Sequence, residues 1–300
     1  MALVECVPNF SDGRDASVAA AIQDAIRSVT GTRLLDWHSD PDHHRSVATF
    51  AGDGPAVSES AFRAIAVASR RIDLSTHQGV HPRMGATDVC PFVPLVPEEL
   101  PICVELAHGL GRRVADELAI PVYFYGAAAL RPERRALPEV RRGGFEALRE
   151  AVASEPARAP DVGPRRLHPT AGATAVGARG FLVAFNVNLE TSDIGVARAI
   201  ARAIREVRGG LPGIRALGFP LASEGIVQVS INVCEPSRTG LRRVFDEVQR
   251  LAGERGVAVR DSELVGLAPR SALDADVARA VRLRGFEARR HVLEEALAAP

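Results

Sequence analysis

The sequence contains no lysine, and all 37 of its basic residues are arginine. A Schiff-base lysine, a pyridoxal-phosphate enzyme and a P-loop that carries a lysine are therefore excluded. The acidic residues also number 37, so the formal net charge is zero, and no bulk field indicates a nucleic-acid or membrane partner. An anionic ligand must instead be held by a local group of arginines.

Aromatic residues and long apolar runs are scarce as well. Aromatics make up 5% of the chain, which disfavours an RNA-binding surface of stacked rings. No window approaches the roughly 18 consecutive apolar residues of a membrane span, and residues 1–10 lack the basic start of a signal peptide. The four cysteines have no CxxC or metal-ligand spacing, which is typical of buried free thiols in a reducing cytosol. We expect a cytoplasmic protein.

Two common catalytic motifs are also missing from the sequence. There is no GxSxG nucleophile elbow. No GxGxxG follows a predicted strand, and the glycines of residues 209–213 are interrupted by Pro212 at the end of a predicted helix. General acid–base catalysis, combined with the positioning of substrates, is the chemistry that remains.

The stretch from Thr76 to Phe92 is the richest in chemical groups. It places two histidines, an arginine and an aspartate around two glycines and two prolines. Gly79 and Pro82 break regular structure, so the sequence predicts an irregular loop that leads into a strand over residues 87–95. Loops anchored to rigid strands often carry catalytic residues.

His81 is the strongest catalytic candidate on this loop. The proline that follows it favours an extended backbone, and an imidazole pKa of about 6.5 suits proton transfer near neutrality. Asp88 could fix the tautomer of the ring, and Arg83 could bind a carboxylate with two hydrogen bonds. The alternative is an ordinary surface histidine without a function.

A second polar cluster extends from His38 to Arg45, at the bend between two predicted strands. Histidine and aspartate are ligands of zinc and iron, so a metal site has to be considered. However, the adjacent His43 and His44 would point in opposite directions in an extended chain, and His77 and His81 lack a continuous helix to align them. A solvated turn is the simpler interpretation, and a polar wall of a ligand cleft is the functional one.

The order of predicted elements repeats as βαββαβ in each half of the chain. We therefore expect an α+β fold of two ferredoxin-like subdomains, residues 1–178 and 179–300. Packing their helix-free sheet faces toward one another would create a substrate cleft. In the first half the expected elements cover residues 3–10, 16–29, 33–37, 46–52, 56–68 and 87–95. In the second half they cover residues 180–189, 192–207, 214–221, 225–233, 237–256 and 257–265.

The first half has extra elements, a helix over residues 97–118 and a strand over 121–125. Residues 131–178 then form a long connection rich in Arg, Pro and Gly, with one helix expected near residues 145–153. Connections of this length are usually functional or disordered. Because residues 163–178 carry positive charge, a histidine and several glycines, we interpret them as a binding loop, with a merely exposed connection as the alternative.

The chain resembles the formiminotransferase domain family over nearly its whole length. The motifs that carry the resemblance include Val4-Glu5-Cys6-Val7-Pro8-Asn9-Phe10-Ser11 and His81-Pro82-Arg83-Met84-Gly85-Ala86. The matching segments, in chain order, are residues 4–11, 34–36, 45–47, 81–86, 88–92, 172–175, 177–179, 185–189, 228–230 and 263–267.

The resemblance implies two linked α/β subdomains with a substrate tunnel between them, in a homodimer. It also implies transfer of a formimino group from N-formimino-L-glutamate to N5 of tetrahydrofolate in histidine degradation, with tetrahydrofolate as co-substrate and no metal. Vertebrate relatives carry a cyclodeaminase domain after this one. Since this sequence stops at Pro300, we expect a separate cyclodeaminase to act downstream.

The resemblance also implies roles for individual residues. His81 is the expected acid–base catalyst, which would take a proton from N5 as it attacks the amidine carbon and return it to the departing glutamate nitrogen. Carboxylates of the substrates are expected at Arg83, Arg165 and Arg166. The residues expected to bind substrate are Gly163, Pro164, Arg165, Arg166, Leu167, His168, Pro169, Thr170, Ala171, Gly172, Arg83, His38 and Arg45.

Three positions depart from the family pattern. His38 and His44 stand where Asp and Asn are common, and Val80 replaces a common Glu. These positions leave the identity of the donor open, and formyl transfer from N-formylglutamate is the nearest alternative.

Two further alternatives belong to other functional classes. One is a non-catalytic folate-binding protein. The other is a metal-dependent amidohydrolase, and its metal would be held by His38, Asp42, His43 and His81.

Overall fold

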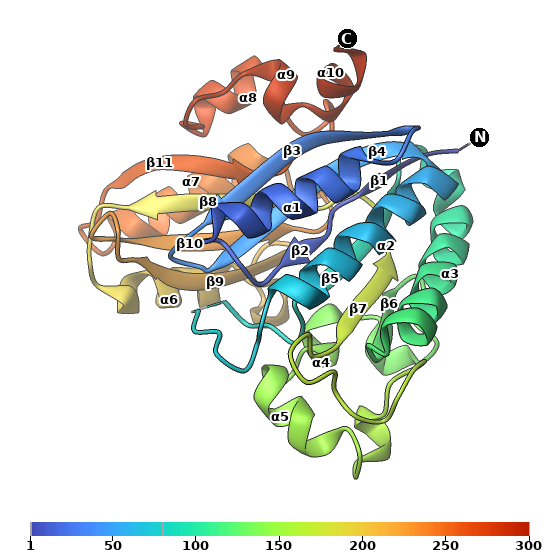
Figure 1. Cartoon of the computed structure of the whole chain (residues 1–300). Helices are drawn as coiled ribbons and strands as arrows, with labels where there is room; N and C mark the ends of the chain where they lie inside the picture. Colours follow the sequence, from blue (N-terminus) through green and yellow to red (C-terminus); the bar gives the residue numbers. More distant parts are fainter. Residues whose placement is uncertain (1, 80, 300) are drawn as a thin grey trace. The chain divides into compact units, whose positions relative to one another are not determined.

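The computed structural model describes residues 2–79 and 81–299. Contacts within the chain divide it into two compact units, Met1–Gly180 and Phe181–Pro300, and each unit has its own sheet and its own hydrophobic core (Figure 1). The expected mixed α+β class with two sheets is confirmed. Among the described residues, no helix has the length and apolar character needed to cross a membrane.

The sheet of the first unit combines antiparallel and parallel strands. Its strands are β1 (Leu3–Cys6), β2 (Asn9–Phe10), β3 (Thr32–Asp40), β4 (Arg45–Asp53), β5 (Thr87–Pro94), β6 (Val122–Gly126) and β7 (Thr174–Ala178). β3 lies beside β4, and both β1 and β2 pair with β4 on one side and with β5 on the other. The single strand expected over residues 3–10 is therefore interrupted between Cys6 and Asn9. Beyond β5 follow β7 and then β6, all parallel.

Three long helices pack on one face of this sheet (Figure 1). They are α1 (Ala16–Arg27), α2 (Gly54–Arg71) and α3 (Leu100–Leu118), and shorter segments are η1 (Pro97–Glu99), η2 (Pro132–Arg134), α4 (Leu137–Val140), α5 (Gly144–Ala151) and η3 (Pro156–Arg158). α1 begins at Asp15, whose carboxylate accepts hydrogen bonds from the backbone N–H groups of Ser17 and Val18. Its buried residues Val18, Ile22 and Ile26 recur every fourth position, which places them on one side of the helix.

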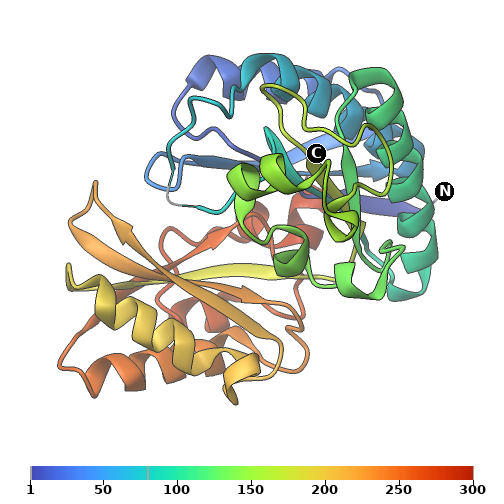
Figure 2. The same cartoon turned by 90° about the horizontal axis from the view of Figure 1, so that it is seen from below.

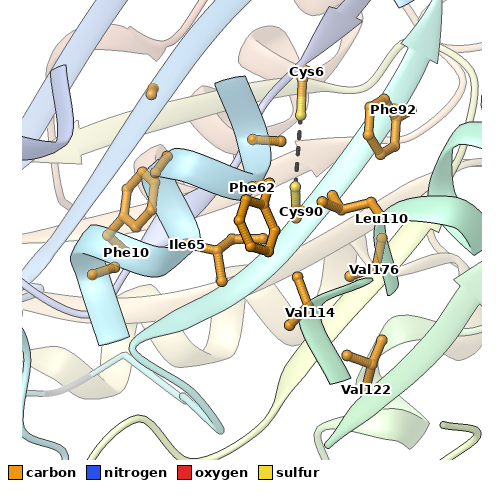
Figure 3. Packing of buried hydrophobic residues seen from close by; sticks show 14 of the residues in the cluster. Cys6, Phe10, Phe62, Ile65, Cys90, Phe92, Leu110, Val114, Val122 and Val176 are labelled. Atoms are coloured by element: carbon orange, nitrogen blue, oxygen red, sulfur yellow. Dashed lines mark hydrogen bonds between the residues drawn. The ribbon is translucent and has the colours of Figure 1, made fainter. Parts of the chain in front are cut away.

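The core beneath these helices is built from aromatic and aliphatic side chains of both layers (Figure 3). Phe10 and Phe92 from the sheet are fully buried, as is Ile65 from α2. The thiols of Cys6 and Cys90, on the neighbouring strands β1 and β5, lie with their sulfur atoms 3.6 Å apart. Both are buried and free, as expected for cysteines that pack as small apolar residues.

One strand of the first unit was not expected from the sequence, and neither was the short helix α4. Residues 174–178, interpreted above as the end of a binding loop, form the strand β7 between β5 and β6. The strand consists mostly of small residues, because its neighbours leave little room. At Gly177 a Cβ atom would lie 2.6 Å from the ring of Tyr125. The small side chains hide the usual strand signal of branched and aromatic residues.

The second unit follows the expected element order. Its elements are β8 (Val183–Leu189), α6 (Ile194–Ile204), η4 (Glu206–Arg208), β9 (Ile214–Leu221), β10 (Ile226–Val233), α7 (Leu241–Gly253), β11 (Val259–Val265), α8 (Ala275–Ala280), α9 (Ala288–His291) and α10 (Leu293–Ala298). The strands are antiparallel in the order β11-β8-β10-β9. α6 and α7 lie together on one face of this sheet (Figure 2). The helices after β11 were not expected from the sequence.

Candidate active site

His81 lies on the irregular loop that joins α2 to β5, as the sequence predicts. The loop is anchored at both ends by backbone hydrogen bonds. The N–H of Leu74 donates to the carbonyl of Thr170 at 2.9 Å, and the N–H of Ala86 donates to the carbonyl of Ala171 at 2.9 Å. These bonds fix the ends of the His81 loop against the expected folate-binding segment.

A buried carboxylate stands at the end of this loop. Asp88 is fully buried on β5. Its Oδ2 accepts a hydrogen bond from Nη1 of Arg45 at 2.8 Å and forms an ion pair with Nη2 of Arg141 at 2.8 Å. Its Oδ1 accepts a hydrogen bond from the backbone N–H of Met84 at 2.9 Å. Arg45 also donates from Nε to Oδ1 of Asn9 at 3.0 Å. Two guanidinium groups facing one carboxylate leave a net positive charge at this place.

The ring of His81 lies beside these charges. Its Nδ1 is 2.8 Å from the carbonyl oxygen of Pro82, a distance at which Nδ1 carries the proton and donates it. Nε2 then holds the lone pair that a general base needs. Burial, followed by the positive charges of Arg45 and Arg141, holds the pKa of His81 well below its usual value. The imidazole is therefore neutral at neutral pH.

Arg141 connects His81 to the buried carboxylate. Its Nη2 is 3.4 Å from Nδ1 of His81, and it also donates to the carbonyl oxygen of Pro82. From the sequence, Asp88 was expected to fix the tautomer directly. In the structure the Pro82 carbonyl faces Nδ1, and Asp88 is linked to the ring through Arg141. Arg141 thus orients the group that determines which nitrogen is protonated.

Arg83 is engaged within the protein. Its Nη2 donates to Oε1 of Glu146 at 2.8 Å and to the carbonyl oxygen of His77 at 3.0 Å, and its side chain is only 13% exposed. These bonds hold α5 against the His81 loop. A substrate carboxylate at Arg83 would have to compete with both partners.

The polar bend between β3 and β4 lies against the His81 loop. The ring of His43 is 6.1 Å from the ring of His81, whereas the ring of His44 stacks on His77 with 4.3 Å between centroids. The chain at His43 and His44 is a turn and not the extended segment expected from the sequence, and each of the two rings lies near a different histidine of the His81 loop. Among residues 2–79 and 81–299, no three His, Cys, Asp or Glu side chains converge in a group that could hold a metal ion. Val80 lies outside the described residues.

The second pair of histidines is also neutral near neutral pH. Nδ1 of His44 accepts a hydrogen bond from the backbone N–H of Gly13 at 3.1 Å. Burial, followed by the nearby His77 and Arg14, lowers the pKa of His44 to about 4. Burial also lowers the pKa of His77. The stacked pair therefore joins the bend to the loop without adding charge near neutrality.

The expected folate-binding segment, residues 163–172, ends in a tight turn. The backbones of His168 and Gly172 exchange two hydrogen bonds of 3.0 Å each. Gly172 has a φ of 67°, and a Cβ atom there would lie 2.4 Å from the carbonyl oxygen of Met84. Arg165 and Arg166, in the first half of the segment, are exposed. The segment therefore has one end fixed beside the His81 loop and exposed positive charge along its course.

His38 lies on β3 opposite Val47 of β4 and is partly exposed. Its neighbour Trp37 stacks on Phe10, with 5.8 Å between ring centroids, and packs against the core beneath α1 and α2. Because side chains alternate along a strand, His38 points to the other face of the sheet. That face also carries Arg45, at the start of β4.

Arg141 and Asn9 were not identified from the sequence as functional candidates. Asn9 lies within a motif that matches the family, but its side chain offered no separate chemical signal. Arg141 follows α4 in the Arg-rich connection, where it is followed by Arg142. Arg141 has a side chain 15% exposed, and Arg142 has one 72% exposed. Only burial distinguishes the two, and burial depends on the tertiary fold.

Comparisons with known proteins identify the family of this chain. Residues 3–179 match the model of the formiminotransferase domain, N-terminal subdomain, and residues 184–281 match the formiminotransferase domain. A glutamate formimidoyltransferase of Streptococcus pyogenes serotype M1 is 44% identical over 296 residues, which cover 98% of each chain. A glutamate formimidoyltransferase of Thermoplasma acidophilum is 46% identical over 290 residues, which cover 96% of this chain and 95% of the relative.

A eukaryotic relative matches over a similar length of this chain. The formimidoyltransferase-cyclodeaminase of Mus musculus is 44% identical over 277 residues, which cover 90% of this chain and 51% of the mouse protein. The two subdomain models therefore match consecutive parts of this chain, and two relatives match nearly its whole length. The chain belongs to the formiminotransferase family.

Proposed function

We propose that this chain transfers the formimino group of N-formimino-L-glutamate to N5 of tetrahydrofolate, with His81 as the general acid–base. Its family membership makes it a one-carbon group transferase that uses tetrahydrofolate as co-substrate. The observation that carries the role of His81 is the Nδ1 contact of 2.8 Å with the Pro82 carbonyl. With the proton on Nδ1, Nε2 carries the lone pair of a ring whose pKa is lowered by burial, Arg45 and Arg141.

The proposed reaction requires one proton to move between two nitrogens. As N5 forms its bond to the amidine carbon, Nε2 of His81 takes the proton that N5 loses. The same proton is then returned to the glutamate nitrogen as its bond to that carbon breaks, so glutamate leaves as a neutral amine. The lowered pKa of His81 keeps the ring neutral before attack and makes the protonated ring a stronger acid than an ordinary imidazolium, which favours return of the proton to the glutamate nitrogen.

Substrate carboxylates are assigned to the arginines of the first unit. Arg165 and Arg166 are exposed on the segment 163–172, where a guanidinium can bind a carboxylate with two hydrogen bonds. The net positive charge of Arg45 and Arg141 favours an anionic donor near His81. His38 is proposed to line the same site, and Arg83 is proposed to keep the loop in position.

The proposed architecture is a pair of ferredoxin-like subdomains, residues 1–178 and 179–300, with a substrate cleft between them. The strand order β11-β8-β10-β9 supports this assignment for the second unit, because it is the order that a split βαβ repeat produces. We further propose a cytoplasmic homodimer that functions without a metal and a separate cyclodeaminase that consumes its product.

The reaction is tested by mixing the purified protein with formiminoglutamate and tetrahydrofolate and following the formation of 5-formiminotetrahydrofolate. A parallel assay with N-formylglutamate measures the competing formyl transfer. We expect a higher kcat/KM for the formimino donor. Folate binding without turnover of either donor would reject the proposal, and activity that depends on stoichiometric zinc or iron would indicate the amidohydrolase class instead.

A further inference from the structure

The second unit carries a polar network on the sheet face that α6 and α7 leave uncovered. Phe185 of β8 lies in the core with these helices. Because side chains alternate along a strand, Asn186 and Asn188 of β8 point to the opposite face. Asn188 pairs across the ladder with Gln228 of β10, and Asn186 pairs with Glu263 of β11. These polar side chains thus form rows that cross three neighbouring strands.

Hydrogen bonds join these side chains and hold Glu263 in place. Oε1 of Glu263 accepts from Nδ2 of Asn186 at 2.9 Å and from Nε2 of Gln228 at 2.9 Å. Gln228 also donates to Oδ1 of Asn188 at 3.0 Å. Asn188 and Gln228 are fully buried, and Asn186 is 4% exposed. The amides therefore fix the position of a carboxylate that is itself only partly buried.

Two acceptor atoms of the network have no donor among the described residues. One is Oε1 of Gln228, which is buried and without a hydrogen-bond partner there. The other is Oε2 of Glu263, for which the described residues provide no hydrogen bond or ion pair. The neighbouring Asp261 differs, since it is paired with Arg284 at 3.0 Å. A buried carbonyl without a donor is unfavourable, so the network offers two acceptors to the N–H groups of a bound molecule.

We propose that this network, centred on Glu263, binds the 2-amino-4-oxopyrimidine edge of the pterin of tetrahydrofolate. That edge presents a ring N–H and an amino group side by side, which match a carboxylate with two parallel hydrogen bonds. The fixed amides give the carboxylate a set orientation, and Gln228 provides an additional acceptor. The identity of the ligand rests on the proposed function, whereas the acceptor pattern does not.

The site is tested with the full-length protein and 6-methyltetrahydropterin, which has the pterin but no glutamate tail. Binding is measured by anaerobic calorimetry, and KM is measured for tetrahydrofolate and for formiminoglutamate. Glu263→Gln keeps the shape and the acceptor for Asn186, but places an amino group where the ligand needs an acceptor. We expect the pterin affinity to fall by about 10–100-fold, with the KM for formiminoglutamate unchanged.

Two further variants keep the test independent of folding. Glu224→Gln removes a carboxylate of the same unit that pairs with Arg260, and it should leave pterin affinity unchanged. Gln228→Met removes the unpartnered acceptor and should weaken binding as well, with thermal unfolding as a check on both variants. Unchanged pterin affinity in folded Glu263→Gln would overturn the site. Failure of 6-methyltetrahydropterin to compete with tetrahydrofolate for binding to the wild-type protein would overturn it as well.

The outcomes separate this site from the proposed function. If the wild type transfers the formimino group and Glu263→Gln has an unchanged KM for tetrahydrofolate, the proposed function stands and the proposed pterin site is rejected. If the protein binds 6-methyltetrahydropterin through Glu263 but transfers no formimino group, the pterin site stands and the proposed function is rejected.

Discussion

The carboxylate of Asp88 is fully buried, where it accepts hydrogen bonds from Arg45 and from the backbone N–H of Met84 and forms an ion pair with Arg141. A buried charge of this kind is stable only while its partners remain, because removing one partner exposes the full desolvation cost of the other. Asp88 therefore has a structural role of its own, separate from any step of catalysis.

Replacing this carboxylate should destabilise the protein strongly. In Asp88→Asn the guanidinium groups of Arg45 and Arg141 remain buried and face one another without an anion. We expect a loss of about 3–5 kcal/mol in the free energy of unfolding, measured by denaturant titration. The control Glu146→Gln breaks the more exposed pair with Arg83 and should cost about 1 kcal/mol or less. Equal losses in the two variants would contradict this role of Asp88.

Arg141 should control the pH dependence of activity. His81 acts in its neutral form, so activity is lost as pH falls through the pKa of His81, and in the wild type that loss lies well below the usual value. Arg141→Gln removes a positive charge beside the ring, so the acid limb of kcat/KM should move to higher pH. Arg142→Gln, at the exposed neighbour, is the matched control. If the midpoint of the acid limb of kcat/KM is at the same pH in Arg141→Gln as in the wild type, the proposed electrostatic role is excluded.

At the scale of elements, the bend between β3 and β4 is joined to the His81 loop by stacked imidazoles. His44 has a φ of 51°, in the left-handed region, which asparagine also adopts because its short polar side chain can bond locally. It also accepts the hydrogen bond from Gly13, which an asparagine oxygen could accept as well. The residue at position 44 therefore influences how the bend responds to acid.

His44→Asn should make the protein less sensitive to acid. The pKa of His44 is about 4 in the folded protein and about 6.5 when unfolded. The unfolded state therefore binds more protons between these values, and stability decreases as pH falls from about 6.5 towards 4. Denaturant titrations at pH 7 and pH 4.5 should show a smaller difference for the variant. An identical difference in both proteins would refute the assignment.

The turn at Gly172 should be intolerant of a side chain. Gly172→Ala adds the cost of a positive φ, about 1–2 kcal/mol, and a clash with the Met84 carbonyl, 2.4 Å from the new Cβ. Gly225→Ala is a matched control, because φ there is 66° and no atom lies within 4 Å of the Cβ. Unfolding titrations should show the larger loss at Gly172, and the KM for tetrahydrofolate should rise only there. Equal losses would show that the clash is relieved without cost.

At the scale of the whole molecule, much of the element order could be predicted from the sequence, because it depends on local features such as helix caps and apolar spacing. Examples are Asp15 before α1 and the apolar spacing of Val18, Ile22 and Ile26. β7 was missed because tight packing selects small residues such as Gly177, which erase the local pattern. A strand of small residues of this kind is recognised from its tertiary contacts and not from its local sequence.

The candidate site also combines residues that could be predicted from local sequence with residues that could not. His81 could be identified because proline, glycine and charged residues surround it in sequence. Arg141 could not, since it reaches His81 from a distant segment and resembles Arg142 in every local respect. The acceptor pattern at Glu263 depends on the register of three strands, which the sequence leaves undetermined. Chemistry carried by one loop was predictable, and chemistry assembled across the fold was not.

The measurement that tests the account most directly is the turnover of His81→Gln in the complete formimino-transfer assay. The account predicts that kcat falls by about 10²–10⁴-fold, while the free energy of unfolding stays close to that of the wild type. His291→Gln, on α9 of the second unit, is the control and should retain full activity. A folded His81→Gln protein with turnover close to that of the wild type would contradict the central claim that this imidazole carries the proton.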